Sequence, residues 1–531
     1  MRKSILKSIP NKTIMALLFL VLASSVFLPQ EIQAKTCSGL TGNGTTDDSD
    51  ALEGCLSSAI PGDIINLPSG KYLLNGNRIF IIPEKVSLVG ATGAEIINGS
   101  FSLSNYSKII SFEFSGRDRA IIIGERALVT GAEVRNNTFG SSPTWTTLLA
   151  YRANDCIIDN NTFNGAVVNW PTIVGGNIQF GGGKRNKITN NKIYGGRTSI
   201  IWLPHTNLNG ATDMFEDNEI TGNYVENPSE EAITLDGRAD SDDNIAAKEY
   251  DKLSSVGTNQ VTLSNSNWAK QSSPGYVGYD LVFIDGNLIG QTRKIISRSG
   301  ATLTLDGSVA GAAVGNQITI GATAKRNLIA HNTVVGSWTA INLYGMCFNN
   351  IVEYNTVTTD IIKSVSSDNG RIFNGSVTKT YGRGPNGYNI IRYNTLENAS
   401  SPTKGVIESI YFHIPKQQWH DNVYSPYTTY GNCIYGNKIG NKLRGYLQSM
   451  YVSNNTGKQD LTDVNLLAQC MEKNSLPGDF NSDNKVNTLD YEIMKTEFLK
   501  TGTNLKSDMN KDNKVNTLDY ELFRREFGKK K

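Results

Sequence analysis

The chain has 531 residues, which is enough for one large domain and additional small ones. Its formal net charge is only +2, so the composition gives no basic footprint for nucleic acid and none for an anionic membrane surface. Glycine (51) and tyrosine (22) are abundant and charged residues make up 19%, which is typical of a β-rich, turn-rich extracellular protein rather than a helical one.

Residues 1–34 have the pattern of a secretory signal peptide. An apolar stretch at 14–28 is followed by a small residue, Ala34, and is preceded by the basic residues Arg2, Lys3, Lys7 and Lys12. The alternative is a retained membrane anchor, although the stretch is shorter than the roughly 20 residues of a membrane-spanning helix. We therefore expect a secreted chain, extracellular or in a cell-surface assembly, without a membrane span after cleavage.

Residues 35–100 begin with a turn (42–48), an amphipathic helix (48–59) and two strands (64–67 and 68–74). A helix here would cover the open end of a coil of strands. The turn GNGTTDD and the strand LPSGKY (67–72) resemble the N-terminal segment of the pectate-lyase-like superfamily. That resemblance implies a right-handed parallel β-helix and, more loosely, carbohydrate chemistry.

One phrase recurs along the middle of the chain. RNLIAHNTV (326–334) and FNNIVEYNTV (348–357) place Asn332 and Asn355 23 positions apart, and related copies occur at 133–139, 156–163, 186–193, 389–396 and 433–439. A period in the twenties with alternating Ile, Val and Leu predicts stacked parallel strands over residues 35–455. Asn tolerates left-handed turns, and stacked amides can bond from rung to rung. The alternative is a set of unrelated hairpins with Asn turns.

Strand alternation divides the coil into inward and outward side chains. The predicted inward residues are Leu149, Ile178, Phe180, Ile200, Trp202, Ile233, Leu235, Ile341 and Leu343. The predicted outer row of one sheet is Gln179, Thr234, Asp236, Asn342 and Tyr344. Such a row would form a trough for an extended polymer, and the substrate-binding candidates are Gln179, Trp202, Asn342 and Tyr344. Trp202 could stack on a sugar ring, although its position is more typical of a core.

The rhythm breaks between residues 238 and 324. Short β-branched segments at 259–264, 279–286, 291–300, 301–307 and 316–321 predict a small β-barrel or sandwich inserted between two rungs. Such an insertion either flanks the binding face or is decoration.

The catalytic candidates lie at the mouth of this insertion, in LDGRADSDDN (235–244). Asp236 with Asp240, Asp242 and Asp243 could hold calcium against an acidic sugar or act as acid and base. Arg238 or Lys248 could remove a proton next to a uronate carboxyl, and His205 could line the same trough. The catalytic candidates are therefore Asp236, Arg238 and His205. The alternative is a solvated turn.

A second patch comprises Glu408, His413, Lys416 and His420. The chain has no G-x-S-x-G motif and no Gly-His-Gly motif with paired aspartates.

After a predicted linker (456–476) with a short helix, two loops have calcium-binding spacing. DFNSDNKVNTLD (479–490) and DMNKDNKVNTLD (508–519) begin 29 positions apart. A hard cation such as Ca²⁺ takes six to eight oxygen ligands, and this 12-residue spacing can supply them. The predicted ligands are Asp479, Asn481, Asp483, Lys485 (carbonyl), Asn487 and Asp490, then Asp508, Asn510, Asp512, Lys514 (carbonyl), Asn516 and Asp519.

Each loop leads into one helix, YEIMKTEFLK or YELFRREFGK. This duplicated loop–helix unit at 477–531, with Asp at position 12, resembles a type I dockerin. The resemblance implies two bound Ca²⁺ ions and docking to a cohesin module on a scaffold or surface protein. It also implies that Thr488, Leu489, Thr517 and Leu518 select the cohesin, and their near identity suggests that either half could face it. A further calcium in the β-helix is the remaining cofactor expectation.

The six cysteines suit an oxidising compartment. Cys37 with Cys55, and Cys433 with Cys470, are candidate bridges, although sequence does not fix pairing. Cys156 and Cys347 lie in rung phrases and are expected to be buried apolar residues.

The first functional hypothesis is a secreted carbohydrate-active β-helix enzyme, a polysaccharide lyase or glycoside hydrolase, tethered to a cohesin-bearing scaffold. The alternatives are a non-catalytic glycan-binding or surface-scaffold protein and a uronate epimerase.

Overall fold

The structure is a computed structural model, and it describes residues 34–140, 146–165, 176–203, 214–236, 238–239, 251–264, 277–337, 339–344, 346–358, 371–375, 386–397, 408–413, 429–440, 442–446, 449–462, 465–467, 470, 478, 480, 486–502, 505–509 and 514–528. The chain divides into two compact units. The N-terminal unit comprises Met1–His205 and Asn218–Ile233, and the C-terminal unit comprises Thr206–Asp217 and Thr234–Lys531. The predicted signal peptide lies outside the described residues except for Ala34. Within the described part of the chain, no helix has the length and apolarity needed to cross a membrane.

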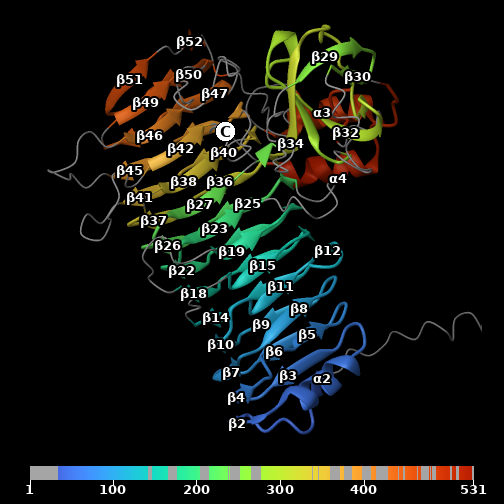
Figure 1. The fold of residues 1–531 in the computed structure, drawn as a ribbon. Helices are drawn as coiled ribbons and strands as arrows, with labels where there is room; N and C mark the ends of the chain where they lie inside the picture. Colours follow the sequence, from blue (N-terminus) through green and yellow to red (C-terminus); the bar gives the residue numbers. More distant parts are fainter. Residues whose placement is uncertain are drawn as a thin grey trace, which may run out of the picture. The chain divides into compact units, whose positions relative to one another are not determined.

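The N-terminal unit is a coil of three parallel sheets, A, B and C, that turn from one to the next in every rung (Figure 1). Sheet A contains β1 (Ala34–Thr36), β3 (Ile64–Leu67), β6 (Ser87–Gly90), β9 (Lys108–Ile110), β12 (Val129–Thr130), β13 (Glu133–Arg135), β16 (Ala153–Asn154), β17 (Ile157–Asp159), β20 (Gly183–Lys184), β21 (Lys187–Thr189) and β25 (Glu219–Thr221). Sheet B contains β2 (Asn43–Asp47), β4 (Gly70–Leu73), β7 (Ala94–Ile97), β10 (Glu113–Ser115), β14 (Thr138–Phe139), β18 (Thr162–Asn164), β22 (Lys192–Tyr194) and β26 (Tyr224–Glu226). Sheet C contains β5 (Ile79–Ile82), β8 (Ser100–Leu103), β11 (Ile121–Ile123), β15 (Leu148–Ala150), β19 (Gly176–Phe180) and β23 (Thr198–Trp202).

Helix α2 (Ser49–Ser57) lies at the first rungs of this coil and confirms the predicted helix (Figure 1). It buries Leu52, Cys55 and Leu56, which share one face. The Cys37–Cys55 disulfide ties this helix to the chain before it, as the sequence suggested. The bare end of the coil is thereby covered at its beginning.

The C-terminal unit repeats the three sheets. Sheet A contains β24 (Phe215–Glu216), β35 (Ala324–Lys325), β36 (Leu328–Ala330), β39 (Cys347–Phe348), β40 (Ile351–Glu353), β43 (Asn386–Gly387), β44 (Ile390–Arg392), β47 (Thr429–Tyr435), β50 (Ser449–Ser453) and β52 (Asn465–Leu466). Sheet B contains β37 (Thr333–Val335), β41 (Thr356–Thr358), β45 (Thr395–Glu397) and β48 (Lys438–Ile439). Sheet C contains β27 (Glu231–Leu235), β38 (Thr339–Tyr344), β42 (Arg371–Gly375), β46 (Glu408–His413), β49 (Lys442–Tyr446) and β51 (Lys458–Thr462). The predicted linker at 456–476 therefore needs correction, because β51 pairs in parallel with β49 and continues the coil beyond residue 455.

Within each unit, asparagine side chains link successive rungs, and all of them are buried except the partly buried Asn455. In each series of these ladder asparagines, Oδ1 of one residue accepts two hydrogen bonds from the asparagine on the preceding rung, one from its backbone N–H and one from its Nδ2. The distances are 2.9 to 3.0 Å in the series Asn332, Asn355, Asn394, Asn437 and Asn455. They are 3.0 to 3.1 Å in the series Asn137, Asn161, Asn191 and Asn223. The Asn-turn phrases thus stack along a common axis within each unit, which confirms the predicted rung-to-rung bonding and the parallel β-helix.

The insertion is a closed antiparallel barrel. Its strands are β28 (Arg238–Ala239), β29 (Asp251–Val256), β30 (Gln260–Leu263), β31 (Asp280–Phe283), β32 (Thr292–Ser299), β33 (Thr302–Leu305) and β34 (Gln317–Ala322), with one 3₁₀ turn, η3 (Gly286–Leu288). The ring runs β34-β29-β30-β33-β32-β31 and closes where β31 pairs with β34. All five predicted strands are present, and the structure selects the barrel over the sandwich.

The barrel is anchored to the coil of its own unit by a buried patch. Val282 and Ile284 of the barrel pack against Met346 and Phe348 of the coil. Beside them the buried Lys325 Nζ lies 2.5 Å from Asp280 Oδ2 and 3.2 Å from Glu216 Oε1. Burial works against the charge on Lys325, but the two carboxylates outweigh it and raise the pKa of the lysine above its usual value.

The C-terminal end of the chain carries helices α3 (Thr488–Glu497) and α4 (Thr517–Glu526). They share a small core of Phe480, Val486, Met494, Val515 and Phe523. The Cys433–Cys470 disulfide joins β47 to the segment after β52, and Cys156 and Cys347 are free and buried. All four cysteine expectations are confirmed.

Candidate functional site

The predicted trough lies on the outer face of sheet C. In the N-terminal unit the strand register aligns Leu149, Gln179 and Ile201, so Gln179 does lie on the outer row. Its Oε1 accepts a 2.8 Å hydrogen bond from Thr146 Oγ1. Leu149 is 4% exposed but belongs to this same row by register, because Leu148 and Ala150 are the residues that align with Ile178 and Phe180. The interpretation of Leu149 as inward was therefore wrong by one position.

Trp202 does not face the trough. It aligns with Phe180 on the inward row, and its side chain is 1% exposed. A ring that is enclosed on both faces has no surface left for a sugar to stack on. The structure thus corrects its assignment as a substrate-binding residue and places it in the core.

The acidic candidate lies in the C-terminal unit. Asp236 follows β27, and its side chain is buried, as is that of Asn342 on β38. The structure describes Arg238 and Tyr344 only by their backbone, in β28 and β38. The remaining trough candidates, His205, Asp240, Asp242, Asp243 and Lys248, lie outside the described residues. The catalytic roles of Asp236, Arg238 and His205 therefore stay predictions.

The second predicted patch is described only at its edges. Glu408 and His413 are the first and last residues of β46, known by their backbone alone, while Lys416 and His420 lie outside the described residues. The described residues do not test whether these four side chains lie together, so the patch stays a prediction.

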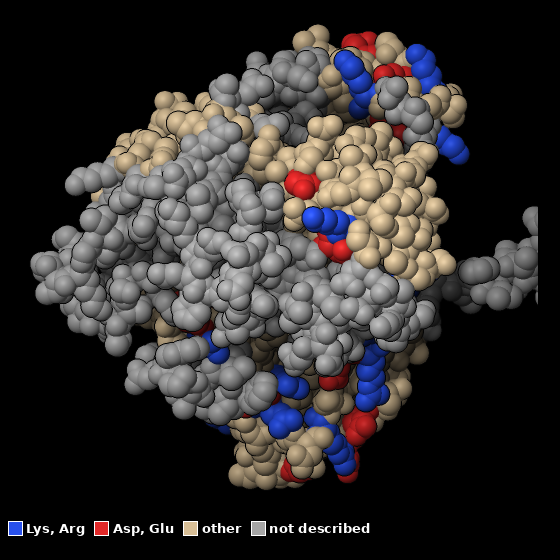
Figure 2. Space-filling view, turned by 45° about the horizontal axis from the view of Figure 1, so that its top comes forward, with Lys and Arg blue, Asp and Glu red and all other residues tan. Residues whose placement is uncertain are grey.

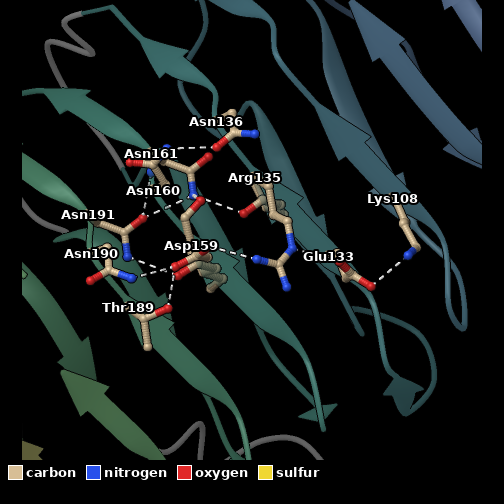
Figure 3. A network of polar contacts seen from close by, with 12 residues as sticks. Lys108, Glu133, Arg135, Asn136, Asp159, Asn160, Asn161, Thr189, Asn190 and Asn191 are labelled. Atoms are coloured by element: carbon tan, nitrogen blue, oxygen red, sulfur yellow. Dashed lines mark hydrogen bonds and ion pairs between the residues drawn. The ribbon is translucent and has the colours of Figure 1, made fainter. Parts of the chain in front are cut away.

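A polar network that the sequence pattern did not reveal lies on the outer face of sheet A in the N-terminal unit (Figure 3). Glu133 pairs with Lys108 at 2.8 Å and with Arg135 at 2.7 Å, and Arg135 continues to Asp159 at 2.6 Å. Asp159 also accepts from Thr189 Oγ1 at 2.5 Å. Four neighbouring strands supply these residues, because positions aligned across parallel strands share one face.

The charges in this network are paired in a way that stabilises the rungs and does not suit an acid–base pair. Burial alone would raise the pKa of Glu133, but hydrogen bonds and charge from Lys108 and Arg135 outweigh it and leave that pKa lowered. Burial is likewise outweighed at Asp159, whose pKa is lowered by hydrogen bonds from Thr189, Asn190 and Arg135. A general acid near neutral pH needs a raised pKa, so neither carboxylate suits that role.

The C-terminal loops end in a repeated capping arrangement. Asp490 Oδ1 accepts from the Phe480 N–H at 2.7 Å, and its Oδ2 accepts from the Asn487 N–H at 2.9 Å. Asp519 does the same with Met509 at 2.8 Å and Asn516 at 2.9 Å. Each aspartate therefore closes its loop onto the start of its helix as a capping box.

The donor set at these loops fits a hard cation. Asp490 and Asp519 are fully buried carboxylates, and a carboxylate keeps lone pairs beyond two hydrogen bonds. Of the other predicted ligands, Asn487, Asp508, Lys514 and Asn516 are described, whereas Asp479, Asn481, Asp483, Lys485, Asn510 and Asp512 lie outside the described residues. All twelve would supply oxygen, the ligand that Ca²⁺ prefers. Among the described residues, no group of three His, Cys, Asp or Glu side chains gathers into a further metal site.

The first turns of α3 and α4 expose apolar side chains at matching positions. Leu489 is 60% exposed and Leu518 is 63% exposed, each beside an exposed threonine, Thr488 or Thr517. A core this small leaves no room for them, so they are available to a partner. Elsewhere on the described surface seen in Figure 2, basic and acidic side chains lie side by side and do not gather into a patch of one sign.

The described chain is thus a parallel β-helix protein with an inserted barrel and a C-terminal pair of loop–helix repeats. Residues 477–528 match the family model of the dockerin type I domain, which confirms the predicted dockerin. Dockerins of this type generally bind calcium and dock to cohesin modules, typically in extracellular assemblies. No characterised protein sequence matches the chain significantly.

Several solved structures are similar to this chain over most of its length. The surface adhesin PfbA of Streptococcus pneumoniae is 11% identical, with 81% of this chain and 91% of that chain covered and a TM-score of 0.47. A family 28 exopolygalacturonase of Yersinia enterocolitica is 9% identical, with 83% and 76% covered and a TM-score of 0.45. The A-module of the mannuronan C-5 epimerase AlgE4 of Azotobacter vinelandii is 10% identical, with 82% and 96% covered and a TM-score of 0.36. Identities this low carry no function to this chain.

Proposed function

We propose that this chain is a secreted component of a cohesin-based assembly and that its β-helix acts on a polysaccharide. The observation that carries the proposal is the repeated C-terminal module, with capped loops, exposed leucines and a dockerin family match. In this proposal two Ca²⁺ ions hold the two loops, and Thr488, Leu489, Thr517 and Leu518 contact the cohesin.

The reaction proposed is cleavage of a glycosidic bond by a lyase or a hydrolase. In a lyase, Arg238 would remove the proton next to a uronate carboxyl, and Asp236 would hold a calcium ion that screens that carboxyl. In a hydrolase, Asp236 would supply one of the two carboxyl groups. His205, Gln179, Asn342 and Tyr344 would contact the sugar chain. A uronate epimerase would share the proton abstraction without breaking the chain.

A second candidate function, glycan binding without catalysis, is favoured by one observation. Asp236 is buried, and the Glu133 and Asp159 carboxylates of the sheet A network are held ionised by their partners. Glu133 and Asp159 therefore lack the raised pKa of a general acid, and Asp236 lacks the exposure that a group reaching the substrate from solvent would have.

The test is a panel of pectin, alginate, chondroitin and neutral polysaccharides, incubated with the full chain with and without calcium. Rising absorbance of unsaturated uronate identifies a lyase, and reducing ends without that absorbance identify a hydrolase. Asp236→Asn is expected to lower the rate at least about a hundredfold, the range of one acid–base group. The exposed Glu113→Gln in β10 serves as the control. Full activity in Asp236→Asn would remove Asp236 from the mechanism, and no product in any assay would favour glycan binding or epimerisation.

A further inference from the structure

A column of exposed aromatic rings runs along one turn of the C-terminal unit. His331, Tyr354 and Tyr393 occupy the same turn, between sheets A and B, on successive rungs. The His331 and Tyr354 ring centroids are 5.3 Å apart with planes 2° from parallel, and those of Tyr354 and Tyr393 are 5.2 Å apart at 25°. Tyr354 is 49% exposed, Tyr393 is 43% exposed, and His331 is exposed as well.

The backbone at these positions is unfavourable for such side chains. All three residues have positive φ, at 57°, 52° and 54°. The equivalent turn of the N-terminal unit holds Asn136, Asn160 and Asn190, whose φ angles are 56°, 52° and 55°. Asparagine visits this left-handed region readily, whereas a bulky side chain there is an outlier.

The two turn columns differ in how they use their side chains. In the N-terminal unit Asn160 Nδ2 donates to Asn136 Oδ1 at 2.8 Å, and Asn190 Nδ2 donates to Asp159, so the amides are consumed by neighbouring rungs (Figure 3). In the C-terminal unit the rings face solvent. Stacking between exposed rings at best offsets the backbone cost, so stability alone does not account for them.

The stack leaves ring surface available. The rings sit on successive rungs, whose strands are about 4.8 Å apart, and about half of Tyr354 and of Tyr393 remains exposed beside the stack, at 49% and 43%. An extended pyranose chain has a repeat close to the rise of one rung, and its C–H faces are the apolar surfaces that aromatic rings accept.

Polar groups flank the column on both sides. Thr333, Thr356 and Thr395 align across β37, β41 and β45 two residues after each ring, and their hydroxyls suit the rim of a sugar. On the other side Arg392 pairs with Glu353 at 2.6 Å. The charges beside the rings are therefore matched, which favours an uncharged chain over a polyuronate.

We propose that His331, Tyr354 and Tyr393 form a binding surface for a neutral polysaccharide, separate from the sheet C trough. The surface needs no catalytic group and does not depend on the reaction proposed for Asp236. It would hold the protein on an insoluble or branched glycan while the sheet C trough acts on another part of that glycan.

The test compares the full chain with the double variant Tyr354→Asn/Tyr393→Asn in calcium-containing affinity gels of β-glucan, arabinoxylan, galactomannan or polygalacturonate. The variant restores the residue that the equivalent N-terminal turn carries, so its melting temperature is expected to be unchanged or higher. Its retardation by a neutral polysaccharide is expected to weaken at least about tenfold, the loss of a little over one stacking contact. Tyr106→Asn is the matched control, because Tyr106 is an exposed tyrosine at φ 58° outside the column.

Equal binding by the folded double variant and the wild type would overturn the proposal, as would binding of polygalacturonate alone or of none of the four polymers. Depolymerisation is scored on the same samples, which separates these outcomes from the proposed function. A double variant that loses retardation but depolymerises as well as the wild type supports the binding surface. A wild type that depolymerises nothing, but whose retardation is weakened in the double variant, contradicts only the enzyme proposal.

Discussion

At the scale of single residues, the ladder asparagines link the rungs of the coil. Asn355 is buried, its Oδ1 accepts two bonds from Asn332, and its Nδ2 donates to Ile329 O and to Asn394 Oδ1 at 2.9 Å each. Asn355→Ala would remove the shared acceptor of the Asn332 N–H and Nδ2 and one donor each to Ile329 O and Asn394 Oδ1, all of them buried. We expect it to lower the free energy of unfolding by about 3 kcal/mol, within the range for buried unsatisfied polar groups.

Urea unfolding of the full chain measures this loss, and Thr356→Ala is the control. Thr356 is the next residue and is exposed, so its truncation should change stability by no more than about 0.5 kcal/mol. If the two variants unfold at the same urea concentration, the ladder does not contribute to stability as described.

The same residues show what sequence could and could not reveal. The shared phrase and its period predicted the stacking of Asn332 on Asn355, because an amide ladder repeats an identical residue at each rung. The reason given for Asn was only partly right. The left-handed residue is the one before the ladder asparagine, as at Tyr354, and the ladder amide itself points inward. Leu149 was misplaced for a related reason: period-two alternation fixes two faces but not which of them is inside.

At the scale of elements, the barrel depends on a buried ion cluster. Lys325→Met would remove the only lysine paired with Asp280 at 2.5 Å among the described ion pairs, and would leave the buried Glu216 with the more distant Lys294 and Arg326, at 4.0 and 3.9 Å. We expect a loss of about 3–5 kcal/mol at pH 7, as for other broken buried pairs. Lys187→Met is the control, since its pair with Glu219 is solvent-exposed and worth at most about 1 kcal/mol.

The pH dependence separates this account from a simple packing defect. In the wild type the pKa of Lys325 is raised by Asp280 and Glu216, so the folded form keeps the lysine proton to a higher pH than the unfolded form does. The contribution of this charge is therefore fully present below the ordinary lysine pKa of about 10.4 and is lost as the pH rises through the folded-state value. The stability difference between wild type and Lys325→Met should be full at pH 7 and shrink above about pH 10. Urea unfolding at both pH values measures this, and an equal deficit at both would show that the charge is not its cause.

The barrel also marks the limit of sequence reasoning about elements. Five of its strands, β30 to β34, were readable as short β-branched runs between turn residues, whereas the six-residue β29 was not predicted. The closure of the barrel was not readable either, because β31 and β34 pair across a long stretch of chain, and Asp280 meets Lys325 only through that closure. The trough faces a similar difficulty, since strand alternation suggested an outward Asp236 and did not indicate that its side chain is buried.

At the scale of the whole molecule, the coil and the C-terminal module draw their stability from different sources. The coil has long ladders and two disulfides, whereas the module has a core of five buried side chains and depends on its loops. If calcium binds those loops, ion at one hundred times its Kd adds about 2.7 kcal/mol to the module alone. Chelation of the full chain should then unfold α3 and α4 at lower temperature and abolish cohesin binding, while the main β-sheet transition stays in place. Asp490→Ala should reproduce the chelator effect on its own half, and Glu492→Ala, an exposed change in α3, should keep the calcium response. Circular dichroism melts with and without chelator, followed by calcium add-back, decide the matter, because a single transition that ignores calcium would mean that the module is held by its small core after all.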